Sequence, residues 1–164
     1  MRPKPITPGT GQESVWDYPR PPRLEAEPRP VRIDFGGVTI ASTSGALRVL
    51  ETSHPPVYYL PPADIAPDIL TPRPGTSYCE WKGTATYLSV TVGADTANDV
   101  AWRYERPVGA YASMAGYVAF YAQAMDACWV GEEQVSPQPG GFYGGWVTSW
   151  VTGPFKGGPG TMGW

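Results

Sequence analysis

Proline and glycine recur along the whole chain and leave little room for helices. The sequence of 164 residues contains 20 prolines and 20 glycines. Proline costs about 3 kcal/mol inside a helix and glycine about 1 kcal/mol, because proline lacks an amide donor and glycine loses the most conformational freedom on folding. Aromatic residues, which strands accommodate well, make up 13% of the chain. The sequence therefore predicts a mainly β domain with many turns.

Short strands separated by turn residues are expected from residue 31 onward. Gly36 and Gly37 lie between residues 31–35 and 38–42, an arrangement typical of a β-hairpin turn. Further strands are predicted at residues 46–51, 57–60, 78–81, 84–92, 100–104, 116–121, 128–130 and 146–151. Their number and spacing predict small antiparallel sheets.

In two segments the sequence does not favour a single type of secondary structure. Residues 61–70 contain three prolines, so we expect at most one helical turn there. Residues 111–121 fit a helical period through Tyr111, Met114 and Val118. We expect a short helical turn followed by a strand in this second segment.

Composition divides the chain into three parts. Residues 1–30 hold eight of the 20 prolines and predict an extended, polyproline-like arm, docked on the body by Trp16. Residues 31–135 are expected to form a single globular β core. Residues 136–164, rich in glycine and aromatic residues, are expected to form a second arm packed on the domain.

The charge pattern and the absence of apolar runs narrow the class of protein. The formal net charge is −3, without a basic block or stripe, which argues against nucleic-acid binding. There is no apolar signal region and no run of 18 apolar residues, so we expect a cytoplasmic protein that does not enter a membrane. In that compartment Cys79 and Cys128 are expected as free thiols, with a disulfide between them as the alternative. The oligomeric state is left open.

The phrase Cys79-Glu80-Trp81-Lys82 is the candidate for catalysis. In a regular strand Cys79 and Lys82 would point to opposite faces, which favours a buried, unreactive thiol. The alternative is an enzyme that uses Cys79 as a nucleophile, assisted by Lys82 or by His54, the single histidine. A structural zinc needs four Cys or His ligands in close pairs, whereas this chain has only three such residues, and no two of them are close in sequence. We therefore expect no structural zinc, and no other metal or cofactor.

Aromatic residues on predicted strands suggest a ligand site. A cleft lined by tyrosine and tryptophan with a few charges would suit either a small molecule, including an anionic one, or a peptide. The residues expected to bind it are Arg48, Glu51, Tyr59, Tyr87, Trp102 and Tyr104, with Lys82 adding positive charge. A third hypothesis is an interaction module whose proline-rich arm a partner recognises.

The order of several phrases resembles a known family. They are VRI (31–33), GGV (36–38), VYYLP (57–61), SYCEWKGTATY (77–87), AWRY (101–104) and GYVAFY (116–121). Together they resemble the family named domain of unknown function 427, over about residues 31–130. The proline-rich and glycine-rich ends resemble those of a longer form of that family.

The resemblance implies a fold and a place to look, but no activity. It implies a small antiparallel sheet domain like the β-tent architecture, without the paired cysteines that hold zinc in other β-tents. The family carries a nucleotidyltransferase-like label, yet this chain lacks a Gly-Ser signature followed by paired metal-binding carboxylates. Motif residues carried over by matching phrases are Glu51, Tyr59, Cys79, Lys82, Gly83, Tyr87, Trp102 and Tyr104.

Overall fold

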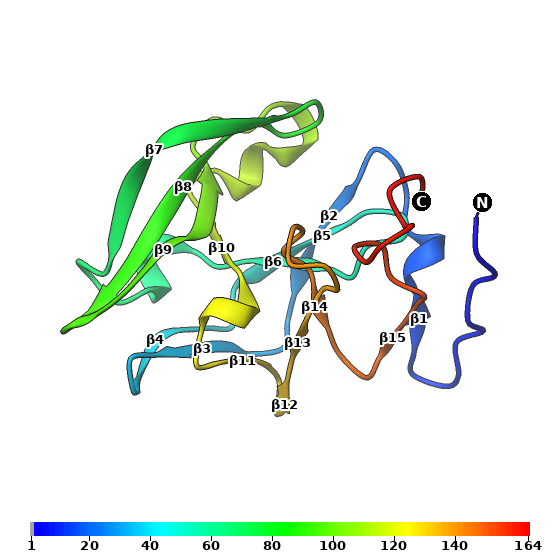
Figure 1. The fold of residues 1–164 in the computed structure, drawn as a ribbon, viewed down its shortest axis with the longest axis horizontal. Coiled ribbons are helices and arrows are strands. Elements are labelled where there is room, and N and C mark those ends of the chain that lie inside the picture. The colour runs from blue at the N-terminus through cyan, green and yellow to red at the C-terminus, as the bar shows by residue number, and fades with distance from the viewer. Residues whose placement is uncertain (1) are drawn as a thin grey trace.

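Strands dominate the computed structural model, which describes residues 2–164 (Figure 1). Fifteen short strands and four 3-10 helices are present along this part of the chain. The strands form five small sheets, and none of these sheets closes into a barrel within the described residues. The prediction of a mainly β domain with small antiparallel sheets is confirmed.

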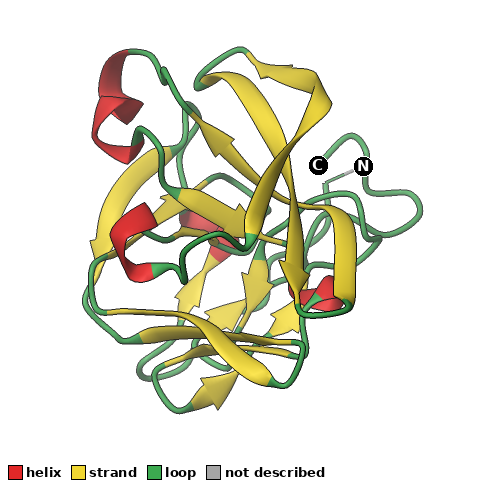
Figure 2. Ribbon diagram, turned by 90° about the vertical axis from the view of Figure 1, so that its left-hand side faces the viewer, coloured by secondary structure: helices red, strands yellow, loops and turns green. Residues whose placement is uncertain are grey.

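Three sheets form the body of the domain (Figures 1 and 2). The first has the order β12 (Glu133–Gln134), β11 (Ala127–Val130), β3 (Val31–Phe35) and β4 (Val38–Thr43). The second has the order β10 (Val118–Phe120), β9 (Asp95–Tyr104), β8 (Gly83–Val92) and β7 (Leu70–Cys79). The third has the order β2 (Arg23–Glu27), β5 (Ala46–Leu50) and β6 (Val57–Tyr59).

Smaller elements complete the fold. Two pairs add β1 (Glu13–Ser14) with β15 (Val151–Thr152), and β13 (Ser136–Pro137) with β14 (Trp146–Val147). The β1–β15 pair is parallel. The 3-10 helices are η1 (Val15–Asp17), η2 (Pro62–Asp64), η3 (Gly109–Met114) and η4 (Ala122–Ala124). None of the helices seen between residues 2 and 164 has the length and apolar character needed to cross a membrane.

The predicted hairpin between β3 and β4 is confirmed. Gly36 and Gly37 have φ angles of 63° and 79°. A two-residue turn of this type needs positive φ at both positions, and glycine adopts it without a steric penalty. The hairpin presents Val31 and Ile33 to the main core, where both are fully buried.

A single bridge joins the third sheet to the second. Leu60 and Val118 exchange both backbone hydrogen bonds, at 2.8 and 2.9 Å. This contact holds β6 beside β10 and so brings β6 close to β9. A separate aromatic cluster, distinct from the main core, fills the space between these strands.

The two ends of the chain pack on the body and on each other. The termini lie side by side at one end of the molecule in both ribbon views (Figures 1 and 2). Trp16 is buried, and its Nε1 donates to the main-chain oxygen of Pro154 at 2.9 Å. The segment predicted as an extended arm also contains β2, which pairs with β5 over five residues. Sheet structure therefore begins before residue 31.

Several element boundaries differ from the prediction; β9, for example, begins at Asp95 rather than at residue 100. The strand expected at residues 78–81 is instead the end of the ten-residue β7, followed by a turn. The strand expected at residues 146–151 is two separate strands, β14 and β15, with a turn between them. The helical turn followed by a strand, expected within residues 111–121, is confirmed by η3 and β10.

Candidate functional site

A cavity of about 680 Å³ opens between the second sheet, the third sheet and residues 136–164, here called the C-terminal segment. About half of the residues that line it come from strands β5 to β9. In β9, Val100, Trp102 and Tyr104 share one face because successive side chains of a strand alternate, and Asp99 also reaches the cavity. In β6 the same alternation presents Val57 and Tyr59. The period of two residues in these strands therefore builds the cavity wall.

Cys79 and Lys82 both line this cavity, contrary to the expectation that they point apart. Strand β7 ends at Cys79, which pairs with Gly83 at the start of β8, so residues 80–82 form the turn. Gly83 has a φ of 104°, a conformation that glycine tolerates best. Because the chain reverses here, strand alternation does not extend to Lys82. Cys79 is half-buried rather than enclosed in the core, and no disulfide links it to Cys128.

Five of the six predicted ligand-binding residues line the cavity, namely Glu51, Tyr59, Tyr87, Trp102 and Tyr104. Trp102 meets Tyr59 edge-on with ring centroids 6.4 Å apart, and its Nε1 donates to the Tyr59 hydroxyl at 3.2 Å. Tyr121 packs against Trp102 at 4.7 Å. The Lys82 Nζ atom lies 5.6 Å from the centroid of the Tyr104 ring, within cation–π range.

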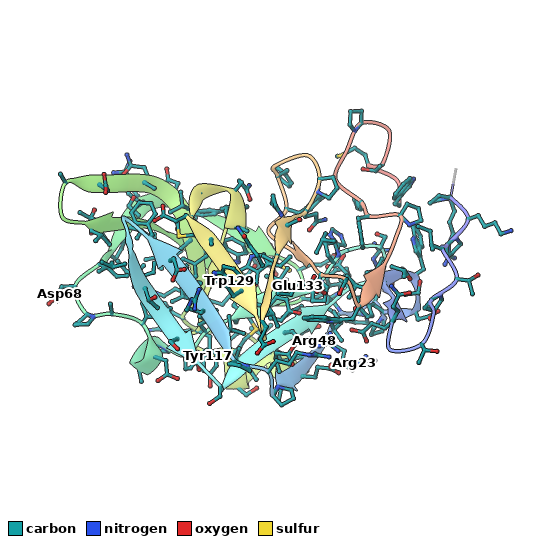
Figure 3. All side chains as sticks on the ribbon, turned by 90° about the horizontal axis from the view of Figure 1, so that it is seen from below. Arg23, Arg48, Asp68, Tyr117, Trp129 and Glu133 are labelled. Atoms are coloured by element: carbon teal, nitrogen blue, oxygen red, sulfur yellow. The ribbon has the colours of Figure 1, made fainter. Side chains whose placement is uncertain are left out.

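Arg48, the sixth predicted residue, lies away from the cavity. It neighbours Val49 in β5, and only Val49 lines the cavity, since adjacent side chains face opposite ways. The Arg48 guanidinium bonds to Glu25 at 2.7 Å and forms a second ion pair with Glu13. Figure 3 shows Arg48 near Arg23 on β2 and β5. Hydrogen bonds to the two carboxylates raise the pKa of Arg48 even though burial opposes this, so its charge is committed to holding β1, β2 and β5 together.

His54 is held in one tautomer at the edge of the cavity. The Oε1 atom of Gln138 accepts from the Gly145 amide at 3.0 Å, so its Nε2 group faces His54 Nδ1 at 3.0 Å and the main-chain oxygen of Lys156 at 2.8 Å. Nδ1 is therefore the acceptor, and the proton of the neutral ring lies on Nε2, 3.5 Å from Glu51 Oε2. Burial, followed by the charge of Lys156, lowers the pKa of His54 from 6.5 to about 3.

The C-terminal segment supplies a wall of the cavity that the sequence did not predict. It contributes Gln138, Gly141, Phe142, Tyr143, Gly144 and Lys156. A Cβ atom added at Gly144 would lie 2.0 Å from Cη2 of Trp102, so only glycine lets the backbone lie this close to the ring. The repeated aromatic-glycine phrases in this segment were the available signal, because glycines beside aromatic residues suit close backbone packing.

The charged side chains that line the cavity differ in whether they have a bonding partner. Glu51 contacts Arg20 at 3.4 Å as well as His54, and Asp99 pairs with Arg73 at 3.4 Å. Lys156 Nζ lies 3.4 Å from the main-chain oxygen of Trp164. The Lys82 ammonium, by contrast, has no carboxylate or other hydrogen-bond acceptor among residues 2–164.

No converging metal ligands accompany these groups. Across the described chain, no group of three or more His, Cys, Asp or Glu side chains is placed to hold a metal ion.

Comparison with known proteins identifies the family. No curated protein matches this chain. The sequence profile described as Domain of unknown function (DUF427) matches residues 23–131. The matched region begins at β2 and ends just after β11, so it includes the cavity-lining residues of β5 to β9 but not the C-terminal wall. The match spans more than half of the chain, which therefore belongs to the DUF427 family.

Proposed function

We propose that this protein binds a small molecule with a planar or aromatic body and an anionic group. The ligand would occupy the cavity between β5 to β9 and the C-terminal segment. Since the sequence predicts a cytoplasmic protein, the ligand would be a metabolite of that compartment.

The size and lining of the cavity support this proposal. Its volume of about 680 Å³ falls within the range of about 300–1,000 Å³ that is usual for small-molecule sites. Rings of Trp102, Tyr121 and Tyr143 line it from two sides and offer stacking surface. Tyr78 and Phe142 stand at its rim and are 77% and 73% exposed, although large apolar rings usually avoid water.

The observation that carries the proposal is the free Lys82 ammonium facing this aromatic cavity. An ammonium group in a partly desolvated site attracts an anion more strongly than one in bulk water, because the effective dielectric constant is lower. The two lining carboxylates already contact arginine or histidine. An incoming anion would therefore gain the interaction with Lys82 without displacing an internal ion pair.

A thermal-shift screen of cytoplasmic metabolites, followed by calorimetric titration of the hits, tests the proposal. A matched pair of variants locates the binding. Gln123→Trp places a ring at the cavity from an exposed position, whereas Gln134→Trp adds the same ring at an exposed position of β12 that does not line the cavity. We expect anionic hits whose affinity falls at least tenfold in Gln123→Trp only. Hits that bind equally to both variants, or no hits at all, would contradict the proposal.

A second candidate function is an enzyme that uses Cys79 as its nucleophile. The observation in its favour is that Cys79 and Lys82 line the same cavity. His54 is a poor assistant, because a pKa of about 3 makes it a weak base and both of its nitrogens face other groups. Turnover of a bound metabolite that Cys79→Ala abolishes, while binding persists, would support this candidate.

The contacts of the proline-rich segment, residues 1–30, favour packing on its own domain over recognition by a partner. The Tyr111 hydroxyl donates to the main-chain oxygen of Pro22 at 2.6 Å, and Arg20 donates to the main-chain oxygens of Thr52 and Trp164. These contacts hold the segment on its own domain.

A further inference from the structure

Several hydrogen-bond donors that line the cavity have no acceptor in the part of the chain that the structure describes. They include the ammonium of Lys82 and the hydroxyl protons of Tyr59 and Tyr104, the two buried tyrosines of the lining. The Tyr59 oxygen accepts from Trp102 Nε1 at 3.2 Å, which occupies a lone pair and leaves the hydroxyl proton unused. The Tyr104 hydroxyl makes no hydrogen bond within residues 2–164.

Both tyrosines are almost completely buried. Tyr59 is 1% exposed and Tyr104 is 6% exposed. Burial raises the pKa of both hydroxyls above the ordinary value of 10, so both groups keep their protons at neutral pH. A buried donor without an acceptor costs about 1–3 kcal/mol, which applies to the Tyr59 hydroxyl proton. The Tyr104 oxygen stays accessible to solvent although the side chain as a whole is buried.

Two of the other lining hydroxyls have acceptors, and those of Tyr78 and Tyr143 belong to less buried side chains. Tyr87 donates to Ser77 Oγ at 2.9 Å, and Tyr121 donates to the main-chain oxygen of Phe142 at 3.1 Å. The lining carboxylates are directed to other partners, as described above. Tyr59 and Tyr104 belong to the same aromatic cluster as Cys79, with ring centroids 6.5 Å apart, and the Lys82 ammonium lies 5.6 Å from the centroid of the Tyr104 ring. The three donors therefore lie near one another.

We propose that Lys82, Tyr59 and Tyr104 form a carboxylate-binding subsite, and that the ligand of this protein is an organic carboxylate. This inference rests on the proposed function and names the group that the cavity recognises. A carboxylate is acceptor-only and has about four lone-pair positions, enough for three donors. One ammonium balances its single charge, whereas a phosphate monoester would bring a charge of about −1.5 to −2.

Alkylation of Cys79 in the full-length protein tests the subsite with probes of matched size. Iodoacetate and iodoacetamide both form a thioether when the thiolate displaces iodide, but only iodoacetate carries a carboxylate. Peptide mass spectrometry separates Cys79 from Cys128, which is 2% exposed. The quantity measured is the rate ratio of iodoacetate to iodoacetamide at Cys79, divided by the same ratio for N-acetylcysteine.

We expect this normalised ratio to be at least ten in the wild type. Lys82→Met and Tyr104→Phe should each lower it severalfold without changing the iodoacetamide rate. Tyr117→Phe is the matched control, because Tyr117 does not line the cavity, and this variant should keep the wild-type ratio. Acetate should protect Cys79 from iodoacetamide, and acetamide should not.

Three results would overturn the inference, and they differ in what they imply for the proposed function. A normalised ratio near one, with no protection by acetate, removes the carboxylate subsite but leaves a ligand cavity in place. Better protection by inorganic phosphate than by acetate assigns the donors to a phosphate instead. If neither reagent labels Cys79 until the protein unfolds, the cavity does not admit small molecules and the proposed function fails as well.

Discussion

The contact between Gly144 and Trp102 predicts that a single methyl group disturbs the cavity wall. In Gly144→Ala the new Cβ atom would lie 2.0 Å from Cη2 and 2.9 Å from Cζ2 of Trp102. The indole has little freedom to retreat, because its Nε1 is bonded to Tyr59 and its ring packs on Tyr121. Overpacking of this kind costs about 1–3 kcal/mol, and the restrained ring places this case at about 2–3 kcal/mol.

The predicted loss is measurable by thermal unfolding. In a chain of this length about 1 kcal/mol lowers Tm by about 2–4 °C, so we expect a decrease of about 4–12 °C. Gly158→Ala is the control, because its added Cβ meets no non-neighbouring atom within 4 Å and its φ is not positive. Tryptophan fluorescence should change only in Gly144→Ala. Equal Tm values for the two variants would show that the C-terminal segment does not pack on Trp102, and the account of this wall would then be wrong.

Three further predictions concern the groups around the cavity. Between pH 7 and pH 5 the unfolded chain protonates His54 and the folded chain does not, because its pKa falls from 6.5 to about 3, so stability decreases with falling pH. We expect His54 to account for about 2 kcal/mol of that decrease, measured as the difference between wild type and His54→Gln in urea unfolding at the two pH values. Gln138→Leu leaves the buried Gly145 amide without its acceptor and should lower the free energy of unfolding in urea by about 1–3 kcal/mol. An unchanged urea midpoint would contradict the hydrogen bonds assigned to Gln138. Arg48→Met should lower the free energy of unfolding by about 2 kcal/mol, because Glu13 and Glu25 lose their partner, and should leave ligand affinity unchanged in titration. Weakened ligand binding with unchanged stability would instead place Arg48 in the ligand site.

Local pattern was sufficient for much of the fold and for one side of the cavity. The two glycines between β3 and β4 determine a turn by themselves, and the period of two in β9 already places Trp102 and Tyr104 on one face. The same period would have separated Arg48 from Val49 and so removed Arg48 from the predicted site. Arg48 had been chosen by residue type rather than by the face of the strand on which it lies.

The rest depended on contacts between distant parts of the chain. Where β7 ends determines whether Cys79 and Lys82 share a face, and strand ends are set by the backbone pairing of Cys79 with Gly83. The C-terminal wall depends on Gln138 meeting His54, 84 residues earlier in the chain. No local pattern encodes such a contact, because glycine-rich segments can pack on many surfaces.

Native mass spectrometry of the protein as purified tests the central claim most directly. The measurement compares the wild type with Gln123→Trp and Gln134→Trp, first under non-denaturing conditions and then after unfolding. We expect the wild type and Gln134→Trp to carry one small organic carboxylate that is released on unfolding, and Gln123→Trp to carry less of it. Retention of the same molecule by all three proteins, or a bare polypeptide mass in all three together with an empty metabolite screen, would contradict a ligand site in this cavity.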